Sequence, residues 1–401
     1  MVLKLPAGNR EPLRLLGTGL ALCLGVLFVF NFNLLLRSAP PPSIGTRPLA
    51  AVHLFAAAPA SAPSGLATSA SVAPAEREAL PPAPAVQAPA PISPVGLAVT
   101  GGLLLAADVG RDQVLARPLL GGPWRVFAGS GFAGYGGDGG PAVDAQLNAP
   151  QGLAVDPAGN TYIADSSNHA IRKVAVDGTI RTIGGIGLRG FSGDGGPAIA
   201  ARLDSPAAVA VGPDGSLFIA DKGNHRVRRV DSGGIITTVA GSGLVSVVAG
   251  SGGFGFSGDG GPATAAQLSA PEGVAAGPNG ELYVADTGND RVRTVSTAGV
   301  ITTIAGGGRD RLSHEIEVAT RAEMRAPVGL AIDATGGLLI GERGGQVIRR
   351  LSGTLLTRVT GTGTRGAEPG LLDDPGALVL AGARLYISET GSGRVTDLEW
   401  R

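Results

Sequence analysis

The sequence PAAVAVGPDGSLFIADKGNHRVRRV at residues 206–230 recurs along the chain and decides its fold. Close copies are PQGLAVDPAGNTYIADSSNHAIRKV from Pro150 and PEGVAAGPNGELYVADTGNDRVRTV from Pro271. Weaker copies begin at Pro94, Pro327 and Pro375. A unit that returns at similar spacing indicates one supersecondary structure stacked on copies of itself.

Each copy predicts a sheet of four short strands. In the copy from Pro150 these are GLAVD, TYIAD, AIRKV and TIRTIGG, separated by turn residues and without a helical period. Such a sheet cannot close its own edges, but radial stacking of six sheets protects them. Small residues such as Gly152 and Ala154 let the first strands crowd around an axis. We expect an all-β, six-bladed β-propeller over residues 94–401, because the alternative, a β-helical solenoid, needs shorter coils.

The repeats resemble NHL repeats. The loops before them, GFSGDGGPAIAARL from Gly190 and GFSGDGGPATAAQL from Gly255, are similar to those of the NHL propeller in teneurin-type proteins and their bacterial relatives. The resemblance implies the propeller fold and carries no activity with it.

Two copies depart from the pattern. The fifth has GRDRLSHEIEVATRAEM in place of the glycine-rich loop, and the sixth ends after its third strand. The outer strand of the sixth blade is therefore either supplied by residues just before Pro94, which would close the ring across the termini, or absent.

The N-terminal region predicts a membrane anchor. Residues 15–36 are 22 consecutive uncharged residues, enough to cross a bilayer core of about 30 Å as a helix. Lys4, Arg10 and Arg14 precede them, which favours a cytoplasmic N-terminus over residues 1–14. The alternative is a cleaved signal peptide, whose apolar region is usually shorter. We therefore expect a single-pass signal anchor with the C-terminal propeller outside the cytoplasm, in the periplasm or at the cell surface.

Composition limits the linker and the partners. Residues 37–93 are rich in Ala, Pro and Ser, which predicts a disordered, extended linker. The 32 Lys and Arg balance 32 Asp and Glu, which argues against a nucleic-acid partner. Cys23 is the only cysteine, so an intrachain disulfide and a cysteine metal cluster are excluded.

A polar turn between the second and third strands is the most repeated polar element. We expect a structural role for its aspartates and asparagines, because Asp accepts backbone amides in turns and Asn tolerates positive φ. These residues are Asp165, Asn168, Asp221, Asn224, Asp286 and Asn289. His169 and His225 follow the asparagine in two copies. Two histidines are too few for a usual zinc site, so we expect exposed turn residues there.

An arginine recurs seven residues after the turn carboxylate. The four copies are Arg172, Arg228, Arg293 and Arg349. This spacing predicts pairing from blade to blade or from turn to strand. A ring of arginines that binds an anion is the alternative.

The loops between blades are the candidate partner-binding elements. They place an aromatic residue and an aspartate at matching positions, namely Tyr135, Asp138, Phe191, Asp194, Phe256 and Asp259. Such rings suit protein contact, and their alternative role is to pack on their own blade. The aspartates can also fix the loop by bonding following amides. A phosphate or calcium site would need more acidic residues than one per loop.

Catalysis is the competing interpretation, because similar six-bladed propellers include lactonases and lyases with a metal in the central channel. The positions expected at the channel mouth are Val95, Gln151, Ala207, Glu272, Val328 and Gly376. Of these only Gln151 and Glu272 could hold a metal. The sequence thus predicts a non-catalytic binding or scaffold module for a protein or glycan, without metal or cofactor. The alternatives are a metal-dependent lyase or lactonase, and an envelope protein that only spaces other components.

Overall fold

The computed structural model describes residues 87–88, 90–91, 93–242, 255–309 and 316–400. The predicted cytoplasmic segment 1–14, the anchor 15–36 and nearly all of the linker 37–93 lie outside these residues. Within the described ranges, no helix is long and apolar enough to cross a membrane.

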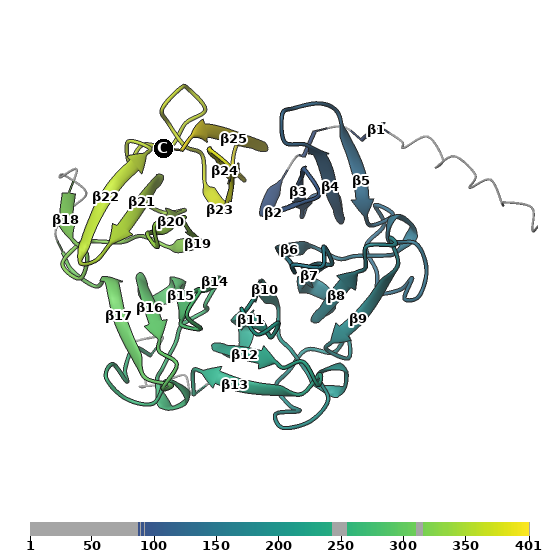
Figure 1. Cartoon of the computed structure of the whole chain (residues 1–401), viewed down its shortest axis with the longest axis horizontal. Coiled ribbons are helices and arrows are strands. Elements are labelled where there is room, and N and C mark those ends of the chain that lie inside the picture. The colour runs from purple at the N-terminus through teal and green to yellow at the C-terminus, as the bar shows by residue number, and fades with distance from the viewer. Residues whose placement is uncertain (1–86, 89, 92, 243–254, 310–315, 401) are drawn as a thin grey trace, which may run out of the picture. The chain divides into compact units, whose positions relative to one another are not determined.

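Six antiparallel sheets surround a central axis and form the predicted six-bladed propeller (Figure 1). Blade one contains β1 (Gln87–Ala88), β2 (Pro94–Thr100), β3 (Leu103–Asp108), β4 (Gln113–Pro118) and β5 (Trp124–Ala128). Blade two contains β6 (Pro150–Val155), β7 (Thr161–Asp165), β8 (Ala170–Val174) and β9 (Ile180–Gly184). Blade three contains β10 (Pro206–Val211), β11 (Leu217–Asp221), β12 (Arg226–Val230) and β13 (Ile236–Ala240).

The remaining blades complete the ring. Blade four contains β14 (Gly273–Ala276), β15 (Leu282–Asp286), β16 (Arg291–Val295) and β17 (Ile301–Gly306). Blade five contains β18 (Ile316–Val318), β19 (Pro327–Ile332), β20 (Leu338–Glu342), β21 (Val347–Ser352) and β22 (Leu355–Thr360). Blade six contains β23 (Pro375–Ala381), β24 (Arg384–Glu389) and β25 (Arg394–Glu399).

Six single-turn helices complete the described elements. Three lie in the loops between blades, η1 (Ala142–Asp144), η3 (Ala198–Ala200) and η5 (Ala263–Ala265), and each begins directly after the proline of the GDGGPA sequence. Three form the turns between second and third strands, η2 (Ser166–Asn168), η4 (Lys222–Asn224) and η6 (Thr287–Asn289). Both kinds are therefore products of the two repeated turn sequences.

The blades are unequal in width. Blades two, three and four have four strands, whereas blades one and five carry β1 and β18 as a fifth, outermost strand. Blade six has three strands in the described chain. The suggestion that residues just before Pro94 complete blade six is wrong, because Gln87 pairs with Arg125 of β5 in blade one. The short β1 therefore widens blade one instead.

The ring is closed between blades six and one by side chains. The Tyr386 hydroxyl donates to the Leu119 carbonyl (2.9 Å), and Thr390 Oγ1 donates to the Pro94 carbonyl (3.0 Å). The Tyr386 ring is buried with Leu97 and Leu104 of blade one. Apolar burial and two hydrogen bonds thus form this junction.

The hydrophobic core lies between neighbouring blades. One cluster joins Leu105 and Val114 of blade one to Ile163 and Ile180 of blade two. Nearer the axis the first strands are too close for larger side chains, as expected. A Cβ atom on Gly273 would lie 2.0 Å from the Val328 carbonyl oxygen of the next blade.

Candidate functional site

The loops between blades and the turns between second and third strands gather on one face, which we call the top face. In blade two, the Asn168 amide donates to the Gly134 carbonyl (2.6 Å), and the Asn148 N–H donates to Asp165 Oδ1 (2.8 Å). Blades three and four repeat the asparagine contact, with Asn224 donating to Gly190 O (2.8 Å) and Asn289 to Gly255 O (3.0 Å). The repeated turn therefore holds the loop that enters each of these three blades.

A buried arginine also holds the loop that enters blade two. Arg172 is fully buried, and its guanidinium donates to Asp165 Oδ2 (3.2 Å) and to Asp138 Oδ1 (2.7 Å). It also donates to the carbonyls of Gln146 and Gly136 in the same loop. The pairing expected from the sequence spacing is thus present, and it includes the loop aspartate.

The same arrangement recurs in the next two blades. Arg228 and Arg293 are also fully buried and bond Asp194 (2.6 Å) and Asp259 (2.7 Å), respectively. In blade five, whose loop lacks this aspartate, Arg349 pairs with Glu342 (2.9 Å) and lies 3.6 Å from Glu317. Since these guanidinium groups are enclosed by protein carboxylates and carbonyls, an anion-binding ring is not built here.

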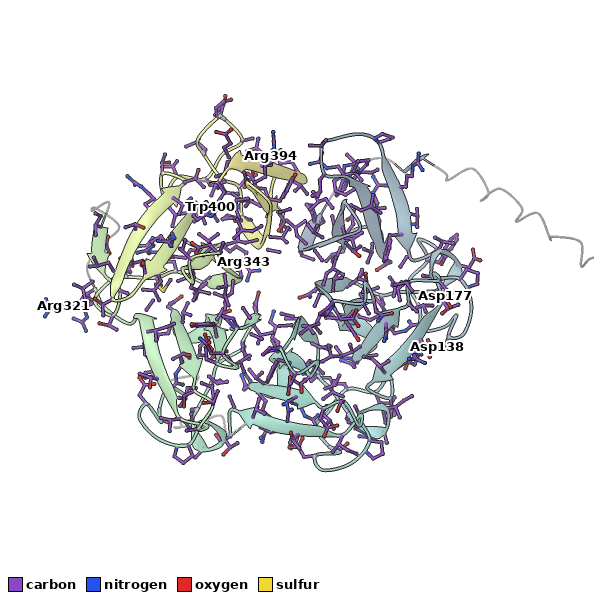
Figure 2. All side chains as sticks on the ribbon, in the orientation of Figure 1. Asp138, Asp177, Arg321, Arg343, Arg394 and Trp400 are labelled. Atoms are coloured by element: carbon purple, nitrogen blue, oxygen red, sulfur yellow. The ribbon has the colours of Figure 1, made fainter. Side chains whose placement is uncertain are left out.

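The two carboxylates on one arginine differ in their environment. Burial raises the pKa of Asp165 to about 6, against the opposing effects of hydrogen bonds from Asn168 and Asn148 and of Arg172. Burial also raises the pKa of Asp138, but the hydrogen bonds from Thr182 and the Arg172 charge outweigh it, so the pKa of Asp138 is lowered. Asp138 is half-exposed and lies toward the outer side of the ring (Figure 2). It is held by the fold even though solvent reaches it.

The three loop aromatics cover these arginines. The Tyr135 ring lies over Arg172, with the guanidinium carbon 5.4 Å from the ring centroid. Phe191 lies over Arg226 (4.0 Å) and Arg228 (4.9 Å), and Phe256 lies over Arg291 (3.8 Å) and Arg293 (5.0 Å). The rings remain 44%, 43% and 39% exposed. Each is positioned by a cation–π contact and still meets solvent.

Further exposed apolar side chains lie on the same loops as Tyr135 and Phe191. A Cβ atom on Gly187 would lie 2.9 Å from Tyr135 Cε1, so the loop after β9 lies against the Tyr135 ring. Ile186 and Leu188 flank this glycine and are exposed, as is Phe132 in the loop of Tyr135. We call these residues, together with Phe191, the apolar rim: Phe132, Tyr135, Ile186, Leu188 and Phe191. The rim lies on the loops that enter blades two and three.

The histidines of the top face are structural. His169 Nδ1 accepts the Ser205 N–H (3.0 Å), and His225 Nδ1 accepts the Ala270 N–H (2.9 Å) of the following blade. Both have positive φ and are partly buried, so the prediction of exposed turn residues is wrong. Burial lowers the pKa of both imidazoles. No group of three potential metal-binding side chains is found in the described part of the chain.

The same blade-to-blade bond occurs at three further junctions, with other acceptors. Asp112 accepts the Ala149 N–H (2.8 Å), Asp290 the Ala326 N–H (2.7 Å), and Gln346 the Asp374 N–H (2.9 Å). We call this contact the junction latch. In five successive copies this position holds a side chain that can accept a hydrogen bond. The residue types differ, so the shared role is not visible when residue identities alone are compared. The sixth copy has Gly393 there, which has no acceptor side chain.

The centre of the top face opens into a small channel cavity of about 120 Å³. Its lining includes all six positions predicted at the channel mouth: Val95, Gln151, Ala207, Glu272, Val328 and Gly376. Glu272 bonds Lys222 of blade three (2.9 Å) and Arg343 of blade five (2.8 Å). Figure 2 shows Arg343 on the inner side of the ring. The one carboxylate in this lining is therefore neutralised by two cations.

Sequence comparisons identify similar repeats. The family described as Teneurin NHL domain matches residues 131–191, 189–251, 225–296 and 253–326. Mouse teneurin-1 is 34% identical over 163 residues, which is 38% of this chain and 6% of the teneurin. The Arabidopsis thaliana protein SUPPRESSOR OF QUENCHING 1, chloroplastic, is 30% identical over 198 residues, 47% of this chain and 18% of that protein. The chain thus spans a small part of these relatives.

Solved structures show the same fold. A Bacteroides thetaiotaomicron protein of unknown function has a TM-score of 0.54 at 14% identity, covering 78% of this chain and 71% of that one. A gluconolactonase from Xanthomonas campestris has a TM-score of 0.52 at 17% identity, covering 78% and 87%. At such identities the likeness concerns the fold alone.

Proposed function

We propose that this NHL-repeat β-propeller, similar to the teneurin NHL domain, is a non-catalytic binding module whose top face recognises a protein or glycan partner. We place the contact on the apolar rim, and we further propose that residues 15–36 anchor the propeller outside the cytoplasm. The apolar rim carries the first proposal.

The polar groups and the apolar groups of the top face have different roles. The loop aspartates and turn carboxylates are engaged by buried arginines and backbone amides. Large apolar side chains are exposed beside them, with Phe132 73% exposed and Leu188 54% exposed. Exposed apolar side chains on several adjacent loops are typical of interaction surfaces.

The rim is also partly ordered before binding. Tyr135 and Phe191 are held over buried guanidinium groups, so fixing these rings against a partner costs little further entropy. Rigid aromatic side chains with one free face are common anchor residues at protein interfaces. Two neighbouring loops supply them, which suits a broad, shallow contact.

The channel supports the non-catalytic interpretation. A metal-dependent lyase or lactonase would need several converging ligands at the channel mouth. In the lining of the described cavity Glu272 is the carboxylate, and Lys222 and Arg343 hold both of its oxygens. Elemental analysis of the purified chain tests this point, because a stoichiometric metal would contradict the proposal.

A matched pair of variants tests the binding face. Phe132→Ser with Leu188→Ser removes two exposed rim side chains without touching an arginine stack. Leu120→Ser with Val176→Ser is the control, because both are exposed in turns at the opposite ends of the strands. We expect crosslinked partner capture from native membranes to fall for the first pair and not for the second. Equal capture by both would refute the rim as the contact.

The anchor is tested separately. In intact cells, an externally added protease should cleave the propeller loops if it lies at the cell surface, and only after outer-membrane permeabilisation if it lies in the periplasm. Protection of the propeller until the cytoplasm is opened would refute the proposed localisation.

A further inference from the structure

One position of the repeated turn holds a cation in two blades. It directly follows the turn carboxylate, and in three blades its hydroxyl donates to the carbonyl of the proline that begins the next blade. These bonds run from Ser166 to Pro206, from Thr287 to Pro327 (2.7 Å) and from Thr390 to Pro94 (3.0 Å). Blades three and five have Lys222 and Arg343 at this position. Two blades therefore carry a positive charge where three others carry a hydroxyl.

Both cations meet one carboxylate at the channel mouth. Lys222 Nζ lies 2.9 Å from Glu272 Oε1, and Arg343 Nη2 lies 2.8 Å from Glu272 Oε2. The Glu272 side chain is largely buried, whereas the two cations are half-buried. Two positive charges and one negative charge leave one net positive charge. The channel mouth is therefore not merely neutralised but favours an anion.

The arginine keeps hydrogen-bond donors for such an anion. A guanidinium group has five N–H donors, and within the described residues the acceptor of the Arg343 side chain is Glu272. The buried Arg172, in contrast, is enclosed by carboxylates and carbonyls. Gln151 lines the same cavity from blade two, which lies across the ring from blade five (Figure 1). A planar carboxylate suits a guanidinium group with free donors, because the two can bond through two parallel N–H···O contacts.

Below this charged mouth the cavity has aliphatic walls. Side chains two residues apart on a strand share one face, so each mouth position is followed by an inward-facing residue of the same first strand. These residues are Leu97, Leu153, Val209, Val274, Leu330 and Leu378, and all six line the cavity. Its volume is about 120 Å³. Since a dry apolar cavity of about 150 Å³ is able to bind benzene, this one suits an apolar group of a few carbon atoms.

We propose that the channel mouth binds a short aliphatic carboxylate. The carboxylate of the ligand bonds Arg343 and the Gln151 amide, while Lys222 balances the charge of Glu272. The aliphatic chain of the ligand lies between the leucine and valine side chains of the first strands. The site is separate from the apolar rim and does not rest on the function proposed for it.

A series of small ligands tests the chemistry. Isothermal titration calorimetry of the purified full chain compares pentanoate with acetate, pentanol and pentylamine. We expect pentanoate to bind about tenfold more tightly than acetate, which lacks the chain, and than pentanol, which lacks the charge. Equal affinity for pentanoate and pentanol, equal affinity for pentanoate and acetate, or tighter binding of pentylamine would each overturn the proposal.

Variants of opposite expected effect test the residues. Arg343→Met should weaken pentanoate binding about tenfold, because the ligand loses its charged partner. Arg321→Met removes the same charge from an exposed residue on the outer side of the ring (Figure 2) and should leave binding unchanged. Glu272→Gln should strengthen binding about threefold, because the net charge at the mouth rises from one to two. Weaker binding in Glu272→Gln, or equal loss in the two arginine variants, would contradict the assignment.

The same chemistry is found in a free acid and in the C-terminal residue of a peptide. The tripeptide Gly-Gly-Leu and its C-terminal amide are therefore titrated beside pentanoate. Tighter binding of the tripeptide, lost in the amide, assigns the site to a chain end, and tighter binding of pentanoate assigns it to a free acid. Binding of neither would overturn the proposal. Phe132→Ser with Leu188→Ser should leave pentanoate binding unchanged, so failures at the rim and at the channel are distinguishable.

Discussion

The junction latch gives the sharpest test of how the ring is held together. His225→Ala removes the acceptor of the Ala270 N–H (2.9 Å). Losing one partner of a partly buried hydrogen bond costs about 1–2 kcal/mol in the free energy of unfolding. His225→Gln should cost less than half of this, because Gln346 performs the same role in blade five. The midpoint of urea unfolding, followed by tryptophan fluorescence, measures both.

The latch also makes stability depend on pH. Nδ1 of His169 and His225 accepts a backbone N–H, which a protonated nitrogen cannot do. Burial lowers the pKa of both side chains, and the charge of the nearby Asp204 opposes this only in part. The unfolded chain therefore binds protons from about pH 6.5 downward, and the folded chain only at lower pH. Stability is lost as the pH falls below about 6.5 and levels off below the folded pKa.

The variant His169→Gln/His225→Gln isolates this effect. Burial raises the pKa of Asp165, Asp221 and Asp286 to about 6, which adds stability as the pH falls through that value. Since these groups are the same in both proteins, their contribution cancels in the comparison. Between about pH 7.5 and 5.5 we expect the wild type to lose stability relative to the variant. A difference that does not change with pH would refute the latch as a titrating contact.

Three further predictions concern stability. Arg228→Met leaves Asp194 and Asp221 without their buried partner. We expect denaturant titration to show a free energy of unfolding lower by about 3–5 kcal/mol, and a loss under 1 kcal/mol would contradict the importance of these ion pairs. Gly273→Ala should lower the melting temperature by several degrees, whereas Gly140→Ala should not, because a Cβ atom would lie 2.0 Å from Val328 O in the first case and 3.4 Å from Gly137 O in the second. Tyr386→Phe removes the bond to Leu119 O and should cost about 1 kcal/mol, with faster hydrogen exchange in β2 and β23 than in β10; uniform exchange would contradict a local effect.

The fold could be predicted from the sequence because the repeat carries its own strand pattern. The small residues Gly152 and Ala154 predicted the crowded axis. The fifth strands β1 and β18 could not be predicted, since strands of two and three residues have no periodicity to detect. Their pairing depends on edges that only the folded blades provide.

The site was predicted less completely, for a physical reason. Asp138 and Arg172 are 34 residues apart, in a loop and in the blade it enters, and within one copy neither residue indicates the other. The fifth copy could have indicated that the arginine needs a carboxylate from the entering loop. Its loop lacks the aspartate while Arg349 remains, and Glu317, in a loop of different sequence, lies near that guanidinium group. A carboxylate partner for the arginine is kept while the loop sequence changes. In the same way, His169, Asp290 and Gln346 differ in residue type but all supply the acceptor of the junction latch.

The junction between blades six and one differs from the others in several respects at once. Five junctions have the latch, whereas Gly393 cannot form it at the sixth. Four junctions have a buried arginine that reaches the entering loop, from Arg172 to Arg349. At the sixth junction Tyr386 and Thr390 make the bonds to blade one, and the blade itself has three described strands. Because local opening begins where bonding is sparsest, we expect the ring to open first at this junction.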